Sequence, residues 1–409
     1  MKKLNVHLTY GPGERRLVGQ LAEVDRRVYF EYDAAFLQDP LWLSPFKLPP
    51  EPGAREHCDL AFGPLFGLFD DSLPDGWGLL LMDRHFTRLG VALETVSPLD
   101  RLAYLGERTM GALTYHPPDR QEGVDHQLLD LHGMSREAHR VMAGTSARVL
   151  PQLLRVGGSA GGARPKVLVG LRGDDMISGE DELPAGYTAW LVKFHASKAA
   201  VDDGRIEYAY AQMAQAAGIA MPIARLFTTP AGEAFFGVAR FDRQQNRRRH
   251  MHTFGNLIHA NFRVPGSDYE LLLKVARVLT KNQADVEALF RQMVFNVLAH
   301  NRDDHVKNFA FMLEPQGAWR IAPAYDLTFA TGPGGEHTMT VAGEGRAPGR
   351  AHLLRLAAGA GIGSRAATDI VEAVATAVAA WSRFARDAAV GTSAARKIES
   401  AVRACLKRL

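Results

Sequence analysis

The sequence predicts a mixed α+β fold with two lobes, preceded by a smaller α/β unit. Three observations support this prediction. Strand-like apolar segments dominate the chain up to residue 241, whereas apolar residues recur at helical spacing after about residue 250. A polar run, NRDDHVKN at 301–308, stands between one of these helical segments and an apolar hairpin.

The N-terminal α/β unit is predicted to cover residues 1–118. The turn sequence LPDG at 73–76 predicts the start of a helix that carries Trp77 to Phe86. The polar stretch 117–140 is expected to be a boundary between units. The expected strands of this unit lie at 4–10, 17–22, 27–32 and 110–115.

The second predicted unit covers residues 145–245 and contains a glycine-rich run, GGSAGGARPK at 157–166. An Ala-rich helix is expected at 207–217, because Gly218 can end it. The polar segment 172–186 is predicted to be a loop. The expected strands lie at 167–170, 187–194, 222–228 and 234–241.

The third predicted unit, residues 246–409, is mainly helical. Segments 309–313 and 319–321, separated by the turn EPQG, predict a hairpin. Two apolar stripes at helical spacing predict buried helix faces. The first is formed by Val286, Leu289, Phe290, Met293, Val294, Val297 and Leu298, and the second by Ile370, Val371, Val374, Val378 and Trp381.

The composition is that of a globular protein, with 46% hydrophobic and 23% charged residues in 409. No apolar run approaches the ~20 residues of a membrane span, so no membrane partner is expected. The N-terminus has no apolar core of a signal peptide. The only two cysteines, Cys58 and Cys405, lie far apart, which fits a reducing cytoplasm.

The charge balance gives no reason to expect direct nucleic-acid binding, because the net charge is only +3. One local exception is the run RRR at 247–249, which follows Arg240 and Arg243. A solvated hairpin turn is the favoured interpretation of this run, and a phosphate-binding patch is the alternative.

The run 301–308 has the spacing of a kinase catalytic loop, because four residues separate Asp303 from Asn308. In that chemistry the aspartate accepts or orients the hydroxyl proton of the phosphoryl acceptor, and the asparagine holds a metal ion against the ATP phosphates. Asp326 follows the predicted hairpin, where a kinase keeps its main Mg²⁺ ligand. Helix, loop, hairpin and aspartate therefore predict the large lobe of a kinase.

Two other interpretations of this run stay open. It could be an ordinary solvated loop, because the same aspartate–asparagine spacing occurs by chance in many proteins. It could also be a hydrolytic metal site, although such sites usually draw their ligands from several separated elements. The candidate ligands are His300, Asp303, Asp304 and His305, and the only other His-rich stretch contains His250, His252 and His259.

A kinase also needs a loop for phosphates, a lysine on a strand and a hinge for adenine. Glycines at 157–166 let backbone N–H groups approach phosphate oxygens, although a flexible turn is the alternative. Lys193 interrupts the apolar strand TAWLVKFH, so it is either an edge lysine that reaches solvent or a phosphate ligand. Phosphate binding is favoured because Asp303, Asn308 and Asp326 follow downstream. Glu207 could orient Lys193, or could simply favour the first turn of its helix. The predicted nucleotide-binding residues are Ser159, Ala160, Gly161, Gly162, Lys166 and Lys193, with the backbone of Ala239 and Phe241 at the hinge.

Taken together, the chain resembles the HipA family, the serine/threonine kinase toxins of bacterial type II toxin–antitoxin pairs. The motifs that carry the resemblance are LPDGWG, SAGGARPK, WLVKFH, ARFDR, NRDDHVKNFAF and APAYDL, in the family's order. The resemblance implies a two-lobed protein-kinase-like fold of the HipA type, with ATP and Mg²⁺ as cofactors. It implies that Asp303 is the catalytic aspartate and that Lys193 contacts the phosphates. Asn308 and Asp326 would be the metal ligands.

The resemblance further implies autophosphorylation at Ser159, which would pull the loop out and disable ATP binding. A phosphoserine carries about −1.5 to −2 charges, and so would compete with ATP phosphates for the same donors. The family's substrates are aminoacyl-tRNA synthetases. Its partner is a small helix-turn-helix antitoxin, HipB-like, through which operator DNA would be bound.

Two positions depart from the family pattern. Arg164 and Pro165 replace a more polar stretch of the loop, and Ala239 replaces a hinge glutamate, which leaves adenine recognition to the backbone. Two alternative functions remain. One is a small-molecule phosphotransferase of the aminoglycoside or choline kinase type, which uses the same D-x-x-x-x-N loop. The other is a non-catalytic corepressor that binds DNA through its antitoxin.

Overall fold

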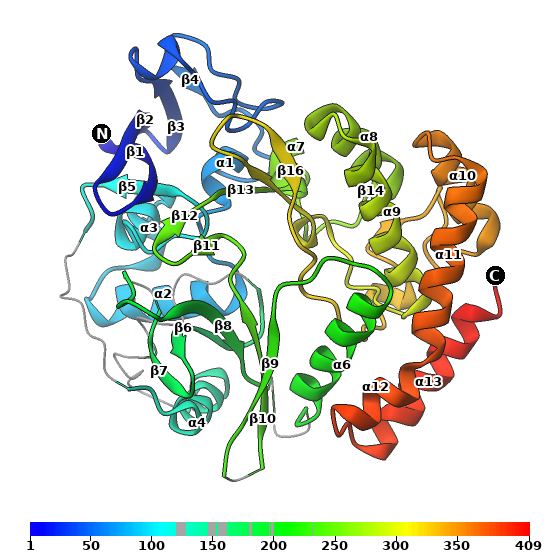
Figure 1. Cartoon of the computed structure of the whole chain (residues 1–409). Coiled ribbons are helices and arrows are strands. Elements are labelled where there is room, and N and C mark those ends of the chain that lie inside the picture. The colour runs from blue at the N-terminus through cyan, green and yellow to red at the C-terminus, as the bar shows by residue number, and fades with distance from the viewer. Residues whose placement is uncertain are drawn as a thin grey trace.

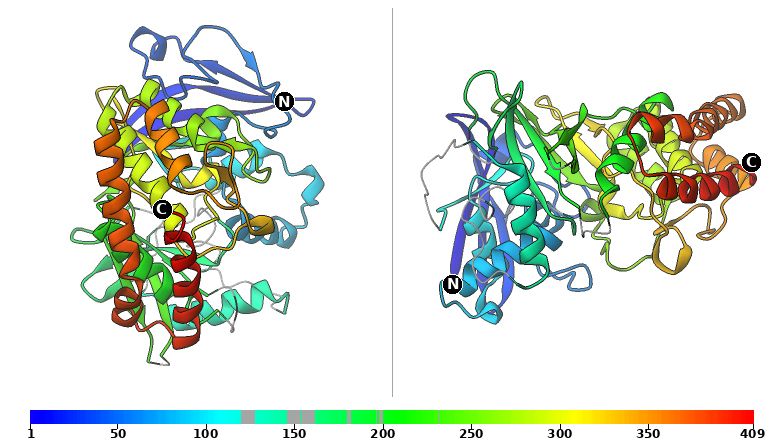
Figure 2. Two further views of the ribbon diagram at one scale, coloured as in Figure 1. Left: turned by 90° about the vertical axis from the view of Figure 1, so that its right-hand side faces the viewer. Right: turned by 90° about the horizontal axis from the view of Figure 1, so that it is seen from below.

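The computed structural model describes residues 1–119, 128–145, 153, 162–179, 182–195, 197, 200–230 and 232–409. Within them, two sheets lie on one side of the molecule and the helices of the C-terminal half gather on the other (Figure 1). Seen from below in Figure 2, the N-terminal strands and the C-terminal helices lie at opposite ends. The predicted α+β architecture is confirmed.

The N-terminal sheet is antiparallel and has the strand order β4-β3-β2-β1-β5. Val6 and Leu8 of β1 are fully buried, because one face of the pleat packs on helix α3 and on Phe69 of α1. The strands are β1 (Lys2–Gly11), β2 (Glu14–Val24), β3 (Arg27–Tyr32), β4 (Arg55–Glu56) and β5 (Leu113–His116). The helices are α1 (Gly67–Asp70), α2 (Gly76–Arg88) and α3 (Pro98–Leu105).

Strand β5 begins at Leu113, three residues later than predicted. Gly111 has a φ of +71°, which interrupts an extended strand. Its N–H donates to the Asp242 carboxylate at 2.8 Å, so this turn holds the N-terminal unit against the chain that follows the second sheet.

The polar stretch 117–140 contains the start of a helix that was not predicted, α4 (Leu131–Met142). Asp130 begins the helix by accepting a hydrogen bond from the N–H of His132. Met134, Ala138 and Val141 are buried in a cluster with residues of the second sheet. The apolar stripe was hidden because polar and charged residues make up most of the helix, and one of them, Glu137, is itself buried.

The second sheet has the order β7-β6-β8-β10-β9, and helix α6 packs against β9 and β10. The segment 172–186 was wrongly predicted to be a loop, since β7 pairs with β6 through a turn at Gly173, whose φ is +60°. The strands are β6 (Lys166–Arg172), β7 (Asp175–Ser178), β8 (Thr188–Lys193), β9 (Ala224–Thr228) and β10 (Ala234–Ala239). Helix α6 covers Asp203–Ala216 and begins four residues earlier than predicted.

The chain after residue 250 is mainly helical, as predicted, although it begins with a strand that was missed. This strand, β13 (His250–Thr253), pairs with β15 of the predicted hairpin. Every residue of the two predicted apolar stripes is buried. The helices are α7 (Phe254–Ile258), α8 (Tyr269–Thr280), α9 (Gln283–Leu298), α10 (Arg350–Gly359), α11 (Ser364–Ala379), α12 (Trp381–Asp387) and α13 (Thr392–Leu406). The remaining strands are β11 (Arg243–Gln244), β12 (Arg247–Arg248), β14 (Ser267–Asp268), β15 (Ala310–Leu313), β16 (Trp319–Ile321) and β17 (Met339–Thr340).

In the part of the chain that the structure describes, no helix combines the length and the apolar character needed to cross a bilayer. The borders of the three predicted units, at 118, 145 and 246, stay predictions.

Candidate active site

The loop 301–308 is fixed at the end of helix α9. The N–H of Asn301 donates to the carbonyl of Asn296 at 2.9 Å. The side-chain Nδ2 of Asn301 also donates to Asn296 Oδ1 at 2.9 Å. The loop then forms a short 3₁₀ turn, Val306–Asn308, and leads into β15. A buried helix and a paired strand therefore hold both ends of the polar loop, as its sequence setting predicted.

The two adjacent aspartates of this loop have opposite environments. The Asp304 carboxylate is fully buried and accepts hydrogen bonds from the Tyr269 hydroxyl and His337 Nδ1, both at 2.7 Å, and from the N–H of Thr338 at 2.9 Å. The side chain of Asp303 is exposed. Asp304 therefore anchors the loop, and the Asp303 carboxylate stays accessible from solvent.

The environment of Asp303 favours its protonated form more than water does. The protein atoms around the carboxyl desolvate its charge and raise its pKa, and the negative charges of Asp326 and Asp304 act in the same direction. His305 partly opposes them. A raised pKa makes a carboxylate a better proton acceptor, which suits a group that receives a hydroxyl proton.

Lys193 lies between two carboxylates that are distant in sequence. Its ammonium contacts Asp326 Oδ1 at 2.5 Å and also bonds to Glu207 Oε1. Burial alone would lower the pKa of Lys193, but the two carboxylates outweigh burial and raise it. Glu207 is buried and lies in the second turn of α6. Its contact with Lys193 therefore supports the orienting role, rather than the alternative of an acidic residue in the first turn of the helix.

Asp326 has a backbone conformation that few non-glycine residues adopt, with a φ of +56°. Such strain occurs where surrounding structure imposes it, often at functional sites. The ammonium of Lys193 holds the pKa of the Asp326 carboxyl well below its ordinary value, so Asp326 is ionised at neutral pH. An ionised carboxylate at this position fits a Mg²⁺ ligand.

Asn308 is buried and donates its side-chain N–H to the carbonyl of Asp303 at 2.6 Å. This bond orients the amide, and its oxygen is the atom that could hold a metal. Carboxylate and amide oxygens are ligand types that Mg²⁺ accepts. The residues at 308 and 326 therefore fit the predicted ion.

The described end of the glycine-rich run lies beside a second lysine. Lys166 stands opposite Lys193 in the pairing of β6 with β8. Burial, reinforced by the charge of Lys193, lowers the pKa of Lys166 to about 8. A Cβ added at Gly162 would lie 2.3 Å from Lys166 Nζ, so the ammonium closely approaches the glycine backbone. Of the other predicted loop residues, Ser159, Ala160 and Gly161 lie outside the described residues.

Arg164 is a site residue that sequence reasoning noted only as a departure. Its guanidinium lies 3.4 Å from Glu207 Oε2 and 4.0 Å from Asp203 Oδ2. It adds a third cation beside the two lysines. The only sequence signal was its position two residues before Lys166.

The predicted hinge is partly engaged in other contacts. The N–H of Ala239 donates to the carbonyl of Ile223 at 2.8 Å, so adenine would have to bond to another backbone group here. Phe241 lies beyond β10 and stacks on Tyr325 with ring centroids 5.7 Å apart. A hollow of about 450 Å³ opens beside Phe241 and is also lined by Met312 and Ile321.

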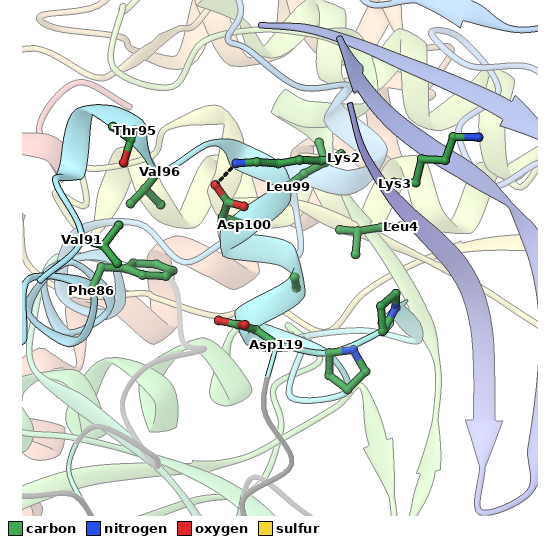
Figure 3. A pocket seen from close by; sticks show the side chains of 13 residues that line it. Lys2, Lys3, Leu4, Phe86, Val91, Thr95, Val96, Leu99, Asp100 and Asp119 are labelled. Carbon is green, nitrogen blue, oxygen red and sulfur yellow. Dashed lines mark hydrogen bonds and ion pairs between the residues drawn. The ribbon is translucent and has the colours of Figure 1, made fainter. Parts of the chain in front are cut away.

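A larger hollow, of about 750 Å³, lies on the N-terminal unit (Figure 3). Lys2 and Asp100 form an ion pair at its wall, and Leu4, Phe86 and Leu99 contribute apolar surface. None of its lining residues belongs to the predicted nucleotide site. This hollow therefore lies apart from the predicted nucleotide site.

The alternative of a hydrolytic metal centre gains no support. Among the described residues, no cluster of three or more His, Cys, Asp and Glu side chains could hold a metal ion. The separate histidines have structural partners: His250 bonds to the carbonyl of Leu43, His252 to Asp71 and His259 to Asp59.

The arginines at 247–249 lie on the predicted hairpin, β11–β12, but bind the protein itself. Arg247 pairs with Glu14 at 2.9 Å, and Arg248 donates to the carbonyl of Glu107. Arg249 donates to Gln244 at 3.1 Å. The cluster ties the hairpin to the N-terminal unit, rather than forming a fully solvated turn.

Comparison with known proteins shows the family of this chain. A model of the HipA N-terminal domain matches residues 13–116, and a model of the HipA-like C-terminal domain matches residues 158–381. HipA of Shewanella oneidensis, solved with HipB and operator DNA, superposes with a TM-score of 0.73 at 17% identity, over 99% of this chain and 96% of that chain. The Helicobacter pylori proinflammatory kinase CtkA gives a TM-score of 0.37 at 10% identity, over 54% of this chain and 88% of that chain, a likeness too slight to support an argument. Because the C-terminal model alone matches more than half of the chain, the protein belongs to the HipA family.

Proposed function

We propose that this HipA-family chain is an ATP- and Mg²⁺-dependent serine/threonine protein kinase that acts as the toxin of a toxin–antitoxin pair. The observation that carries the proposal is the position of Lys193, which bridges Glu207 and Asp326. A kinase requires its strand lysine to pair with a helix glutamate and its metal aspartate to stand in place at the same time. The contacts of Lys193 with Glu207 and Asp326, which lie far apart in sequence, support both conditions.

The roles of the side chains follow from this arrangement. Asp303 accepts or orients the hydroxyl proton of the acceptor, and its raised pKa suits that task. Lys193 and Lys166 neutralise phosphate oxygens, while Asn308 and Asp326 hold the metal. ATP and Mg²⁺ supply the phosphoryl group and the cation that stabilises its charge in transfer. Adenine would bind at the hinge beside Ala239 and Phe241.

We further propose that Ser159 is the site of self-inactivation. It is the only serine or threonine between Gly157 and Gly170, so phosphate within that loop can be carried by no other hydroxyl. The loop ends beside Lys166 and Arg164, cations that would bind ATP phosphates or a phosphoserine but not both.

The proposed substrates are aminoacyl-tRNA synthetases, and the proposed partner is a HipB-like helix-turn-helix antitoxin. The Shewanella HipA structure contains HipB and operator DNA, which supports a partner of this kind. Operator DNA would be bound through the antitoxin. A cytoplasmic location is proposed on the same basis.

The test is phosphoryl transfer from radiolabelled ATP to proteins of a cell lysate, run beside a panel of aminoglycosides, choline and other small hydroxyl compounds. Label in protein, absent with Asp303→Asn, supports the proposal. Label only in a small molecule would replace it with a small-molecule phosphotransferase. ATP binding without transfer to either would support a non-catalytic corepressor.

A further inference from the structure

A segment of the N-terminal unit, Asp70 to Trp77, contacts both loops of the candidate active site. On one side, Asp70 Oδ2 accepts a hydrogen bond from Lys307 Nζ at 3.0 Å, and Lys307 belongs to the catalytic loop. Next to it, Asp71 accepts bonds from the N–H and the hydroxyl of Thr253, at 2.8 and 2.7 Å. These bonds join the segment to the strand that pairs with β15.

On the other side, the same segment forms hydrogen bonds with the end of the glycine-rich loop. The Asp75 carboxylate accepts a bond from the N–H of Gly162, and the N–H of Trp77 donates to the carbonyl of Gly162 at 3.1 Å. The Trp77 indole donates to the carbonyl of Lys166 at 3.0 Å. Both backbone groups of Gly162 are thus engaged by one short piece of the N-terminal unit.

Two details show that these contacts are specific to the loop. Asp75 occupies the N-cap position of α2, yet its side chain makes no capping bond within its own helix and bonds to Gly162 instead. Gly76 has a φ of +45°, and a Cβ there would lie 2.6 Å from the Cα of Ala163. Only glycine permits this close approach of the two backbones.

We infer that the 70–77 segment is a positioning element that sets the place of the glycine-rich loop relative to the catalytic loop, so that the N-terminal unit is part of the nucleotide site. The physical reason is that phosphate-binding amides act only where the loop holds them. The root of this loop is fixed at Gly162 and Lys166 by Asp75 and Trp77, while Asp70 joins the same segment to Lys307. The inference rests on the proposed kinase function for its nucleotide readout.

The first experiment compares Gly76, the first residue of helix α2, with Gly90, which lies just beyond the end of that helix. Gly76→Ala places a methyl group against Ala163, whereas Gly90→Ala meets no atom within 4 Å, although Gly90 also has a positive φ of +74°. Both variants carry backbone strain, and only the first brings a methyl group against the described end of the loop. We expect the KM for ATP to rise at least about fivefold in Gly76→Ala, the effect of losing one hydrogen bond, and to stay near wild type in Gly90→Ala.

The second experiment compares two tryptophans. Trp77 and Trp381 are each 1% exposed, and each indole donates to a backbone carbonyl at 3.0 Å. Trp77→Phe should raise the KM for ATP, while Trp381→Phe should lower thermal stability to a similar degree without changing KM. Asp75→Ala should behave like Trp77→Phe, and Asp75→Asn should restore ATP affinity, because its amide oxygen still accepts the Gly162 N–H.

A readout without nucleotide separates this inference from the proposed function. Hydrogen exchange at Gly162 should be faster in Trp77→Phe and Asp75→Ala than in wild type and in Trp381→Phe. Faster exchange with no ATP binding by the wild-type chain would refute the kinase while upholding the positioning role. Exchange and KM as in wild type for Gly76→Ala, Asp75→Ala and Trp77→Phe would overturn the inference.

Discussion

At the scale of single residues, Asp303 and Asp304 are neighbours of the same residue type that have different environments, and we expect them to have different roles. Asp304 is closed in by three hydrogen bonds, and Asp303 is exposed with a raised pKa. We therefore expect Asp303→Asn to reduce phosphoryl transfer by about 10²–10⁴-fold, the usual contribution of a general base. Because the surrounding protein atoms and the charges of Asp326 and Asp304 disfavour the ionised form of Asp303, removing that charge should not lower stability. Transfer rates and thermal unfolding measured side by side decide the matter, and wild-type activity in a folded variant would exclude Asp303 as the base.

A second prediction concerns the metal. Asp326→Asn keeps the shape of the side chain but removes the full charge that faces Lys193 and the proposed Mg²⁺. We expect the increase in ATP affinity that Mg²⁺ produces to be lost in Asp326→Asn and only reduced in Asn308→Ala, because Asn308 is neutral. Calorimetric titration with and without Mg²⁺ measures this increment. Should the increment survive in Asp326→Asn, the metal must lie elsewhere.

A third prediction follows from Lys166, whose pKa is lowered from 10.5 to about 8. Lys166 is cationic below that pH and becomes neutral above it, so the KM for ATP should rise as the pH passes from 7.5 to 9.5. Bound phosphates will move this transition upward, because they favour the charged form. In Lys166→Gln the KM should be high throughout and lose this dependence on pH.

The dependence of folding stability on pH shows whether unfolding could cause the same rise in KM. Between the folded pKa of about 8 and the ordinary value of 10.5, the unfolded chain binds a proton at Lys166 that the folded chain does not. The contribution of this lysine to folding stability therefore increases with pH in that window. A loss of ATP affinity there cannot be assigned to Lys166-driven unfolding. A KM that rises equally in Lys166→Gln would refute the role of this lysine.

The sequence singled out candidate site residues where a local motif surrounds them. Lys193 interrupts an apolar strand, and Asp303 and Asn308 share one short loop. Lys307 was missed as a link because its partner, Asp70, lies 237 residues away. No spacing rule reaches that far in a single sequence.

At the scale of elements, helix α8 anchors the catalytic loop through one hydroxyl. Tyr269 is fully buried, donates to Asp304 and accepts a bond from Asn296 Nδ2 at 3.0 Å. Tyr269→Phe leaves the Asp304 carboxylate short of a donor, which should cost about 1–3 kcal/mol of folding stability. Denaturant unfolding measures that cost. We also expect kcat to fall while the KM for ATP changes little, because the catalytic loop rather than the glycine-rich loop is loosened.

The matched control is Tyr32→Phe, in the N-terminal sheet. The Tyr32 hydroxyl is also buried and donates to the carbonyl of Leu48 at 2.6 Å, far along the chain from the catalytic loop. The Tyr32→Phe variant should have a lower folding stability and an unchanged kcat. If both variants lower kcat alike, the effect is general destabilisation and α8 has no particular role in positioning the loop.

The elements that sequence patterns missed have physical reasons for being missed. Strand β7 is short and lies in a segment rich in Gly and Asp, which predicts a turn, yet Met176 and Ile177 are buried by tertiary packing. Helix α4 has a polar composition, and its three buried apolar residues are buried by packing with residues of the second sheet, which the local sequence does not show. Long periodic segments such as α9 and α11 were predicted because their pattern continues over several turns.

At the scale of the whole molecule, the N-terminal unit and the two lobes share interfaces rather than standing apart. The largest buried cluster contains residues of the first sheet, of α6 and of the C-terminal helices. This continuity explains why sequence patterns could give the order of the units but could not show that the N-terminal unit contacts both loops of the candidate active site. Such contacts join segments that are separated by 87 to 237 residues.

The surface charge of the whole chain supports a last prediction, that it binds operator DNA only together with a partner. The net charge is +3, and the arginines of the β11–β12 hairpin are engaged by Glu14, Glu107 and Gln244. Tight binding requires several cations free to neutralise phosphates, and it weakens steeply with salt. At physiological salt we expect no mobility shift of its own promoter by this chain alone, and a shift once a helix-turn-helix antitoxin is added. Neutralising Arg247 should then weaken the ternary complex only slightly. Tight, sequence-specific binding by the chain alone would contradict this prediction and would favour a direct role in repression.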